Sequence, residues 1–510
     1  MSDTIVDLDQ CAREPIHIPG YIQPHGVLFV LREAGLKVLQ VSENCQDYFG
    51  LKPEDILRDG LSCILDTAQI ERVQFALDSS DPTENNPVRL DLACQKEDLL
   101  LDGVVHRNDG FSFLELEPTI AAAHTYFLDF YKAVSRITNR LHSSIDLTAL
   151  LGEATSGIRQ LTGFDRVMIY RFSSTQDGQV IAEAKRPDLD PFLGLWYPAS
   201  DIPEQARKLY TLSPIRAIPS VRYEPVLITP IINPESRRPI DLSYSTLRSV
   251  SRVHCEYLTN MGVGASMSVS ILREGKLWGL IACHHTSSHW LSYEARAACI
   301  FLGQVISKEI AQHEMREETQ YITRSTALLA GFMESMATSP SPALGLIGDS
   351  LNLLDLIPAD GVAVVLGDKV RTRGITPGYE ELLLLARALR QIDAPSTFST
   401  KSLQNHFPAM ESLSASASGV IALEISREPQ SYVFYFRPEA SETVTWGGDP
   451  NKPVTLEEEG YRLSPRKSFA AWKEKTHGIA LPWTKQEIQI ADQLRKLISV
   501  VAARGAAREV

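Results

Sequence analysis

The sequence has no excess of basic side chains and no long apolar run. It carries 50 Lys and Arg against 63 Asp and Glu, a formal net charge of -13, whereas binding to nucleic acid needs clustered Lys and Arg. No stretch approaches the roughly 20 apolar residues of a membrane-spanning helix. The opening MSDTIVDLDQ has three aspartates and no basic residue, unlike a secretory signal peptide. We therefore expect a cytoplasmic protein that contacts neither nucleic acid nor a membrane.

Paired cysteines are also missing. The seven cysteines stand at positions 11, 45, 63, 94, 255, 283 and 299 and form no C-x-x-C pair. An odd number without that spacing favours neither a disulfide framework nor a zinc knuckle. Most of them are interpreted as small core residues. Cys11 differs because the segment CAREPIHIPGYIQPHG, which it opens, is polar and irregular, so this thiol needs another explanation.

The length of 510 residues predicts about three domains, each large enough to bury a core. We place them at 1–120, 121–315 and 316–510. Helical and strand-like segments occur together in each domain, which predicts an α+β protein with helices flanking antiparallel sheets. The main predicted helices cover 126–141, 147–161, 252–261, 291–336, 379–392 and a last segment from Thr484. The main predicted strands cover 165–172, 266–272, 277–285, 361–367, 419–426 and 431–436.

Three of these segments have further meaning. The helix at 291–336 is longer than an ordinary globular helix and is interpreted as a rod joining two domains or two chains. Thr484 and Glu487 have the spacing of a capping box. Residues 438–482 contain few apolar positions, and a loop of that length inside a domain is usually functional or disordered.

The segment PASDIPEQARKLY places Asp201, Ile202 and Pro203 just before a helix. Proline removes a backbone donor and favours an extended residue before it, so the carbonyls of this turn are held and can accept hydrogen bonds. The plainer interpretation is that Asp201 caps the helix. The local residues favour that cap.

The segment LRSVSRVHCEYLTNMGVG predicts a helix that Ser251 caps. His254, Tyr257 and Met261 share one face of it, whereas Cys255 is turned by about 100° from His254. A thiol and an imidazole placed in this way make a poor nucleophile and base. The pattern therefore weakens the alternative of a Cys-dependent hydrolase.

Two adjacent histidines end the strand LWGLIACHH. Alternation puts His284 and His285 on opposite faces, so they cannot easily bind one metal ion. No acidic or thiol partner stands at metal-site spacing, and we predict no metal site. A lone histidine of this kind is more often a hydrogen-bonded core residue.

Arginines and hydroxyl groups recur through the middle domain. Arg216 and Arg248 are either surface cations or a grip for two carboxylates, for which the guanidinium group is well shaped. The hydroxyl groups that could assist them belong to Ser251, Ser266 and Ser268. The aromatic residues that could line an apolar slot, or lie in the core, are Tyr170, Tyr197, Tyr210 and Tyr257.

These separated motifs together resemble the phytochrome family, and the resemblance covers nearly all 510 residues. The motifs are CAREPIHIPGYIQPHG, FDRVMIYRF, PASDIPEQARKLY, LRSVSRVHCEYLTNMGVGASMSVSIL, LWGLIACHH, WGGDP and PRKSF. The chain looks like the photosensory core of a bacterial phytochrome, with PAS (1–120), GAF (121–315) and PHY (316–510) domains. The resemblance implies a red/far-red photoreceptor, rather than an enzyme, that binds the linear tetrapyrrole biliverdin IXα.

The resemblance also assigns a role to Cys11, whose thiolate would form a thioether with ring A of the bilin. The pocket belongs to the GAF domain, so the tail would thread a lasso at 218–245 and form a figure-of-eight knot. The resemblance implies that the pyrrole nitrogens are held by His254 and by Asp201 with its neighbours Ile202 and Pro203. The propionates would be held by Arg216 and Arg248, assisted by Ser251, Ser266 and Ser268. His284 would bind the ring D carbonyl, and ring D would be surrounded by Tyr170, Tyr197 and Tyr257, with Tyr210 lining the slot.

In the same way residues 438–482 would be the tongue that closes the pocket. Arg466 would pair with Asp201 in the dark red-absorbing state, and Ser468 would replace it after light isomerises the C15=C16 bond. The long helix would carry the change outward in a parallel homodimer. No kinase segment follows in this sequence, so we expect the output module, a histidine kinase in a full-length protein, to lie elsewhere.

Some positions depart from the family pattern. Many phytochromes attach their bilin through a cysteine just before the pocket histidine, where this chain has Val253, and Cys255 is out of register. Attachment is therefore assigned to Cys11, with Cys255 as the alternative. Arg252 replaces a proline common in bacterial relatives and has no physical explanation here. The alternative from another class of protein is a GAF-type regulatory domain that binds a metabolite or cyclic nucleotide. Such a domain would not need a reactive thiol at Cys11.

Overall fold

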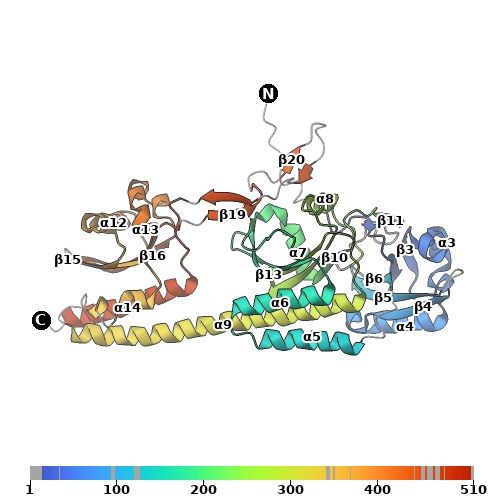
Figure 1. Cartoon of the computed structure of the whole chain (residues 1–510), viewed down its shortest axis with the longest axis horizontal. Coiled ribbons are helices and arrows are strands. Elements are labelled where there is room, and N and C mark those ends of the chain that lie inside the picture. Colours follow the sequence, from blue (N-terminus) through green and yellow to red (C-terminus); the bar gives the residue numbers. More distant parts are fainter. Residues whose placement is uncertain are drawn as a thin grey trace, which may run out of the picture. The chain divides into compact units, whose positions relative to one another are not determined.

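The structure is a computed structural model of the chain (Figure 1). It describes residues 14–33, 35–93, 98–119, 127–339, 345–348, 351–367, 369–440, 443–449, 454–456, 463–465, 471–475 and 477–506. Contacts divide the chain into two compact units, Met1–Ala311 with Thr445–Trp472, and Gln312–Val444 with Lys473–Val510. Each unit has its own sheets and buried apolar clusters.

The first sheet of the first unit has seven strands, each antiparallel to its neighbours, in the order β1-β11-β3-β2-β6-β5-β4. The strands are β1 (Tyr21–Ile22), β2 (Val27–Arg32), β3 (Val38–Ser42), β4 (Val88–Ala93), β5 (Asp98–Asn108), β6 (Phe111–Pro118) and β11 (Val226–Thr229). Helices α2 (Cys45–Phe49), α3 (Pro53–Asp59) and α4 (Thr67–Asp78) pack on the sheet through a core that includes Phe29 and Leu114.

Strand β11 comes from the segment expected to form a lasso. It pairs with β1 of the N-terminal tail. On the other side of the tail, the Gln23 amide donates to the Leu247 carbonyl at 2.7 Å and the Ser249 amide donates to the Tyr21 carbonyl at 3.1 Å. The tail thus lies between β11 and residues 247–249, which follow the segment. The knot itself stays a prediction, because it depends on residues before Glu14, which are outside the described ranges.

The second sheet has eight strands in the order β10-β12-β13-β7-β8-β9-β19-β22. The strands are β7 (Arg166–Phe172), β8 (Gly178–Lys185), β9 (Trp196–Tyr197), β10 (Ile215–Ile218), β12 (Ala265–Arg273), β13 (Lys276–His285), β19 (Thr443–Gly447) and β22 (Ala471–Lys475). The helices are α5 (Phe127–His142), α6 (Leu147–Thr162), α7 (Glu204–Leu212), α8 (Arg252–Asn260) and α9 (Tyr293–Thr338).

The two faces of this sheet differ because side chains alternate along each strand. On one face, Ile169, Met267 and Ile281 join residues of α6 and the first part of α9 in a closed core. The opposite face carries the intervening residues of the same strands and lies toward α7 and α8, and it is this face that holds the cavity described below.

The second unit is built on a five-stranded antiparallel sheet in the order β15-β14-β18-β17-β16. The strands are β14 (Gly361–Leu366), β15 (Lys369–Gly374), β16 (Thr397–Thr400), β17 (Gly419–Arg427) and β18 (Gln430–Arg437). The helices are α11 (Leu353–Leu356), α12 (Tyr379–Gln391), α13 (Ser414–Ala417), α14 (Lys485–Ala506) and the last part of α9.

Both faces of this sheet are covered. Val364 faces a core with α9 and α14, and its neighbour Val365 faces a core with α12. The predicted capping box is confirmed, because the Thr484 amide donates to Glu487 Oε2 at 2.7 Å and the Glu487 amide donates to Thr484 Oγ1 at 3.1 Å. The long helix predicted from 291 is confirmed as α9, which has 46 residues.

The arm expected at 438–482 contains short strands where the sequence suggested only a loop. Besides β19 and β22 these are β20 (Val454–Leu456) and β21 (Leu463–Pro465), which pair with each other. In the first unit, β21 lies against α8, and β19 runs parallel to β9 with Trp446 opposite Trp196. Among the helices described, none has the length and apolar composition to cross a membrane.

Candidate ligand-binding pocket

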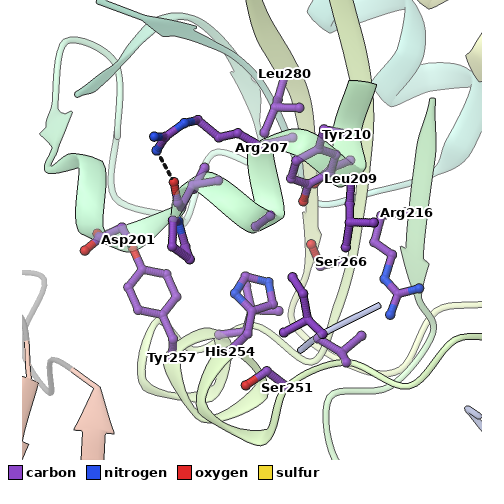
Figure 2. A pocket seen from close by; sticks show the side chains of 18 of the residues that line it. Asp201, Arg207, Leu209, Tyr210, Arg216, Ser251, His254, Tyr257, Ser266 and Leu280 are labelled. Atoms are coloured by element: carbon purple, nitrogen blue, oxygen red, sulfur yellow. Dashed lines mark hydrogen bonds between the residues drawn. The ribbon is translucent and has the colours of Figure 1, made fainter. Parts of the chain in front are cut away.

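A cavity of about 520 Å³ lies between the second sheet, helices α7 and α8, and the segment before α8. All the predicted pocket residues that fall in the described ranges line it: Tyr170, Tyr197, Asp201, Ile202, Pro203, Tyr210, Arg216, Arg248, Ser251, His254, Tyr257, Ser266, Ser268 and His284. Cys11, Arg466 and Ser468 lie outside the described residues. Figure 2 shows Asp201 and Tyr257 on one side of the cavity and Arg216 on the other.

The sheet supplies one wall through alternate residues. Ser266 and Ser268 of β12 and His284 of β13 line the cavity, while Met267 and Cys283 between them lie in the core. Tyr170 of β7 joins this wall because Gly178 on the paired strand has no side chain. A Cβ on Gly178 would be 1.8 Å from the Tyr170 ring, so glycine is required for the ring to keep its place.

The turn before α7 is held by Arg207, which the sequence reasoning missed. Its Nη1 donates to the carbonyl of Ile202 at 2.5 Å, the bond drawn in Figure 2, and to that of Ala199 at 3.3 Å. Asp201 does not cap the helix, whose N-cap residue is Pro203. Its Oδ2 instead accepts the Tyr257 hydroxyl at 2.8 Å. The cap favoured from local sequence was therefore wrong, because Tyr257 of α8 competes for the carboxylate.

Two guanidinium groups line the cavity, and neither has an acidic partner among the described residues. Arg248 is 6% exposed and its Nη1 donates to the carbonyls of Leu242 and Ser243 at 3.3 Å and 3.2 Å. Arg216 Nη2 donates to the carbonyl of Arg248, and its buried Nη1 has no hydrogen-bond partner in the part of the chain that the structure describes. Neither arginine forms an ion pair within the described ranges, and the surface-cation alternative is wrong for Arg248.

Burial strongly affects both groups. It lowers the pKa of Arg248 to about 9, with repulsion from Arg216 adding to the effect, and it lowers the pKa of Arg216. Buried cations are stable only when they are paired. The cavity therefore suits a ligand that brings negative charge to this end.

Ser251 is the N-cap residue of α8, as predicted, but its side chain makes no capping hydrogen bond. Its Oγ instead donates to Glu14 Oε2 at 2.7 Å. Glu14 and Ile16 both line the cavity, so the N-terminal tail reaches it.

Two histidines face the cavity from different elements. The His254 ring is nearly parallel to that of Tyr257, with centroids 6.2 Å apart. The His284 Nδ1 atom is buried and has no hydrogen-bond partner among the described residues. Burial lowers the pKa of His254 to about 4 and that of His284 to about 3, and Arg216 and Arg166, respectively, add to these shifts. His285 faces the opposite side, as predicted, toward Phe164.

We expect His254 and His284 to remain neutral in the ligand-free protein at neutral pH. Because burial lowers both pKa values below the unfolded value of about 6.5, stability is lost as pH falls from about 6.5 toward 4, where the unfolded chain binds more protons. NMR shifts of the imidazole nitrogens in the ligand-free protein test this. The His254→Gln and His284→Gln variants assign the signals, and a titration of either ring near 6.5 would contradict the prediction.

Neither a metal site nor a Cys-dependent hydrolase gains support from the described residues. Within the described residues no group of three or more His, Cys, Asp or Glu side chains could hold a metal ion. Cys255 does not line the cavity, and burial raises the pKa of its thiol to about 11. A thiol that stays protonated is a poor nucleophile.

Family profiles match three parts of the chain: the PAS fold over residues 11–119, the GAF domain over residues 146–313 and the phytochrome region over residues 325–506. Cyanobacterial phytochrome B of Nostoc sp. is 43% identical over 494 residues, or 97% of this chain and 66% of that protein. A bacteriophytochrome of Xanthomonas campestris pv. campestris is 34% identical over 97% of this chain and 79% of its own length. The chain belongs to the phytochrome family.

Solved phytochrome structures agree with this. A bacteriophytochrome from the photosynthetic bacterium R. palustris matches with a TM-score of 0.86 and 39% identity, covering 97% of this chain and 99% of its own. The photosensory core module of the Stigmatella aurantiaca phytochrome matches with a TM-score of 0.83 and 40% identity, covering 97% and 98%. The predicted PAS-GAF-PHY architecture of a phytochrome is confirmed. The chain spans 66% of the Nostoc relative.

Proposed function

We propose that this chain is a red/far-red photosensory module that holds biliverdin IXα covalently through Cys11. The observation that carries the proposal is the pair of cavity arginines without a carboxylate partner among the described residues. Two propionates would supply the missing negative charge. An aromatic-lined cavity of about 520 Å³ is also suited to a long conjugated ligand.

Each part of the cavity then has a role. Arg216 and Arg248 would hold the propionates, with the hydroxyl groups of Ser251, Ser266 and Ser268 beside them. The Asp201 carbonyl and His254 would hold the pyrrole nitrogens, in a turn that Arg207 fixes. The buried Nδ1 of His284 has no hydrogen-bond partner within the described ranges, which supports a role in binding the ring D carbonyl. The residues that would enclose the rings are Tyr170, Tyr197, Tyr210, Tyr257, Ile202 and Pro203.

The bound bilin would supply absorption of red light and Z/E isomerisation at ring D. We propose that the arm at 438–482 acts as the tongue, in which Ser468 replaces Arg466 as the partner of Asp201 after isomerisation. We also propose that α9 carries the change outward in a parallel homodimer. The position of β21 against α8 supports this role for the arm. The module itself would not be an enzyme; its partner would be a histidine kinase output in a full-length cytoplasmic protein.

The proposal predicts that purified ligand-free protein mixed with biliverdin gains red absorbance and stays pigmented on a denaturing gel. Cys11→Ser should keep the absorbance and lose the covalent pigment, because the rest of the cavity is intact. Cys255→Ser is the matched control and should remain pigmented. Pigment retained by Cys11→Ser would move the attachment to another thiol, and a protein that stays colourless would reject the function.

A further inference from the structure

A buried carboxylate of the first sheet holds the segment that leads into the cavity. Glu115 of β6 is fully buried and accepts four hydrogen bonds from three consecutive residues. Its Oε2 accepts from Ser245 Oγ at 2.8 Å, Thr246 Oγ1 at 3.1 Å and the Leu247 amide at 2.7 Å. Its Oε1 accepts from the Thr246 amide at 3.1 Å. Glu115 does not line the cavity.

The segment held in this way carries the cationic end of the pocket. Arg248 follows Leu247 directly, and its guanidinium group turns back to the carbonyls of Leu242 and Ser243. The Arg248 carbonyl in turn accepts from Arg216 Nη2. The position of both guanidinium groups therefore depends on the backbone that Glu115 holds.

We propose that Glu115 is a positioning residue for the anion-binding end of the pocket, acting through the backbone of residues 245–248 on Arg248 and Arg216. The inference rests on the proposed function for the ligand that the arginines hold. The first sheet would thus determine how well the second sheet's cavity recognises two carboxylates.

The hydrogen-bond pattern explains why a carboxylate is needed. Four donors point at two oxygen atoms, and a glutamine of the same volume offers one oxygen and one NH₂ group. Whichever way the amide is turned, one backbone N–H group meets another donor: that of Thr246 if the NH₂ group takes the place of Oε1, or that of Leu247 if it takes the place of Oε2. Burial raises the pKa of Glu115 to about 7, and the bonds from Leu247 and Ser245 oppose this shift. The test is therefore made at a pH above this value, where the Glu115 carboxylate is charged.

The test compares Glu115→Gln with Glu43→Gln. Glu43 is the matched control because its carboxylate also accepts a bond from a distant residue, the hydroxyl of Thr229 in β11 at 2.9 Å, but in an exposed position. In the ligand-free protein at about pH 8, Glu115→Gln should speed hydrogen exchange of the Thr246 and Leu247 amides about tenfold or more, since an unsatisfied buried bond weakens the segment. Glu43→Gln should leave that exchange unchanged.

Ligand selectivity supplies a readout that a purely structural role would not change. Biliverdin and its dimethyl ester differ only in the two carboxylates, so the ratio of their affinities reports on Arg216 and Arg248. Glu115→Gln should lower this ratio about tenfold. If Glu115→Gln does not fold, Thr246→Val removes the hydroxyl group, with its bonds to Glu115 and Glu117, and keeps the amide bond to Glu115. It should shift exchange and the ratio in the same direction by less.

Equal weakening of both ligands, or an unchanged exchange rate, would overturn the inference. A wild-type protein that does not bind biliverdin would reject the proposed function instead, and the exchange rates of the ligand-free variants would still decide whether Glu115 holds the segment.

Discussion

Arg216→Gln is expected to weaken the affinity for biliverdin by about tenfold to a hundredfold. A charge-assisted hydrogen bond contributes about 1.5–3 kcal/mol, and about 1.4 kcal/mol corresponds to a factor of ten. The buried Nη1 of Arg216 has no partner among the described residues, so nothing in the ligand-free cavity already uses that donor. The measurement is a titration of ligand-free protein with biliverdin followed by red absorbance, in a Cys11→Ser background so that binding is reversible.

The dimethyl ester of biliverdin separates the charge from the general fit. It should bind Arg216→Gln and the parent protein with similar affinity, because it has no carboxylate to lose. Arg252→Gln is the matched control, since Arg252 is exposed and does not line the cavity. Equal loss of biliverdin and its ester in Arg216→Gln would show that the arginine shapes the pocket without binding an anion.

Glu117→Ala is expected to lower the free energy of unfolding of the first unit by about 3–5 kcal/mol, because it leaves the partner cation buried and unpaired. Glu117 of β6 and Arg296 of α9 form a two-bond ion pair and are 1% and 5% exposed. The Arg296 guanidinium carbon lies 5.4 Å from the centroid of the Trp290 ring, and at 5% exposure the side chain has little access to water. Urea denaturation followed by tryptophan fluorescence measures the loss.

Two further variants make this result specific. Asp59→Asn removes an exposed partner of Arg58 in the same domain and should leave the unfolding transition in place. The double variant Glu117→Leu with Arg296→Met replaces the pair by apolar groups and should recover most of the loss. No recovery would mean that Glu117 stabilises the unit through other contacts, such as its bond to Thr246 Oγ1.

One wall of the cavity could be predicted from the sequence because strand alternation is a local rule. The separation of His284 from His285 follows from that rule, and both faces are found as expected. A helix terminus whose capping partner lies nearby in the sequence, such as Thr484 with Glu487, could be predicted equally well. The resemblance to phytochromes supplied the rest of the pocket, which periodicity alone could not assemble.

The errors have a common cause. Ser251 and Asp201 were expected to cap helices, and both side chains instead bind residues far away in sequence, Glu14 and Tyr257. A capping rule considers only hydrogen bonds between a side chain and the backbone next to it in the sequence. It does not include side chains that are distant in the sequence and compete for the same hydrogen bond. Glu115 was missed for the same reason, since its partners are about 130 residues further along the chain. The strands of the arm are only three to five residues long, too short for a periodic signal.

The parallel pairing of β19 with β9 has a consequence for synthesis of the protein. Trp196 meets Trp446 across this pair, so the ribosome must add about 250 more residues after β9 before its partner exists. At roughly 5–20 residues per second, that edge of the sheet stays open for tens of seconds. An open strand edge invites pairing with other nascent chains, and a chain stopped before residue 443 would keep that exposure permanently.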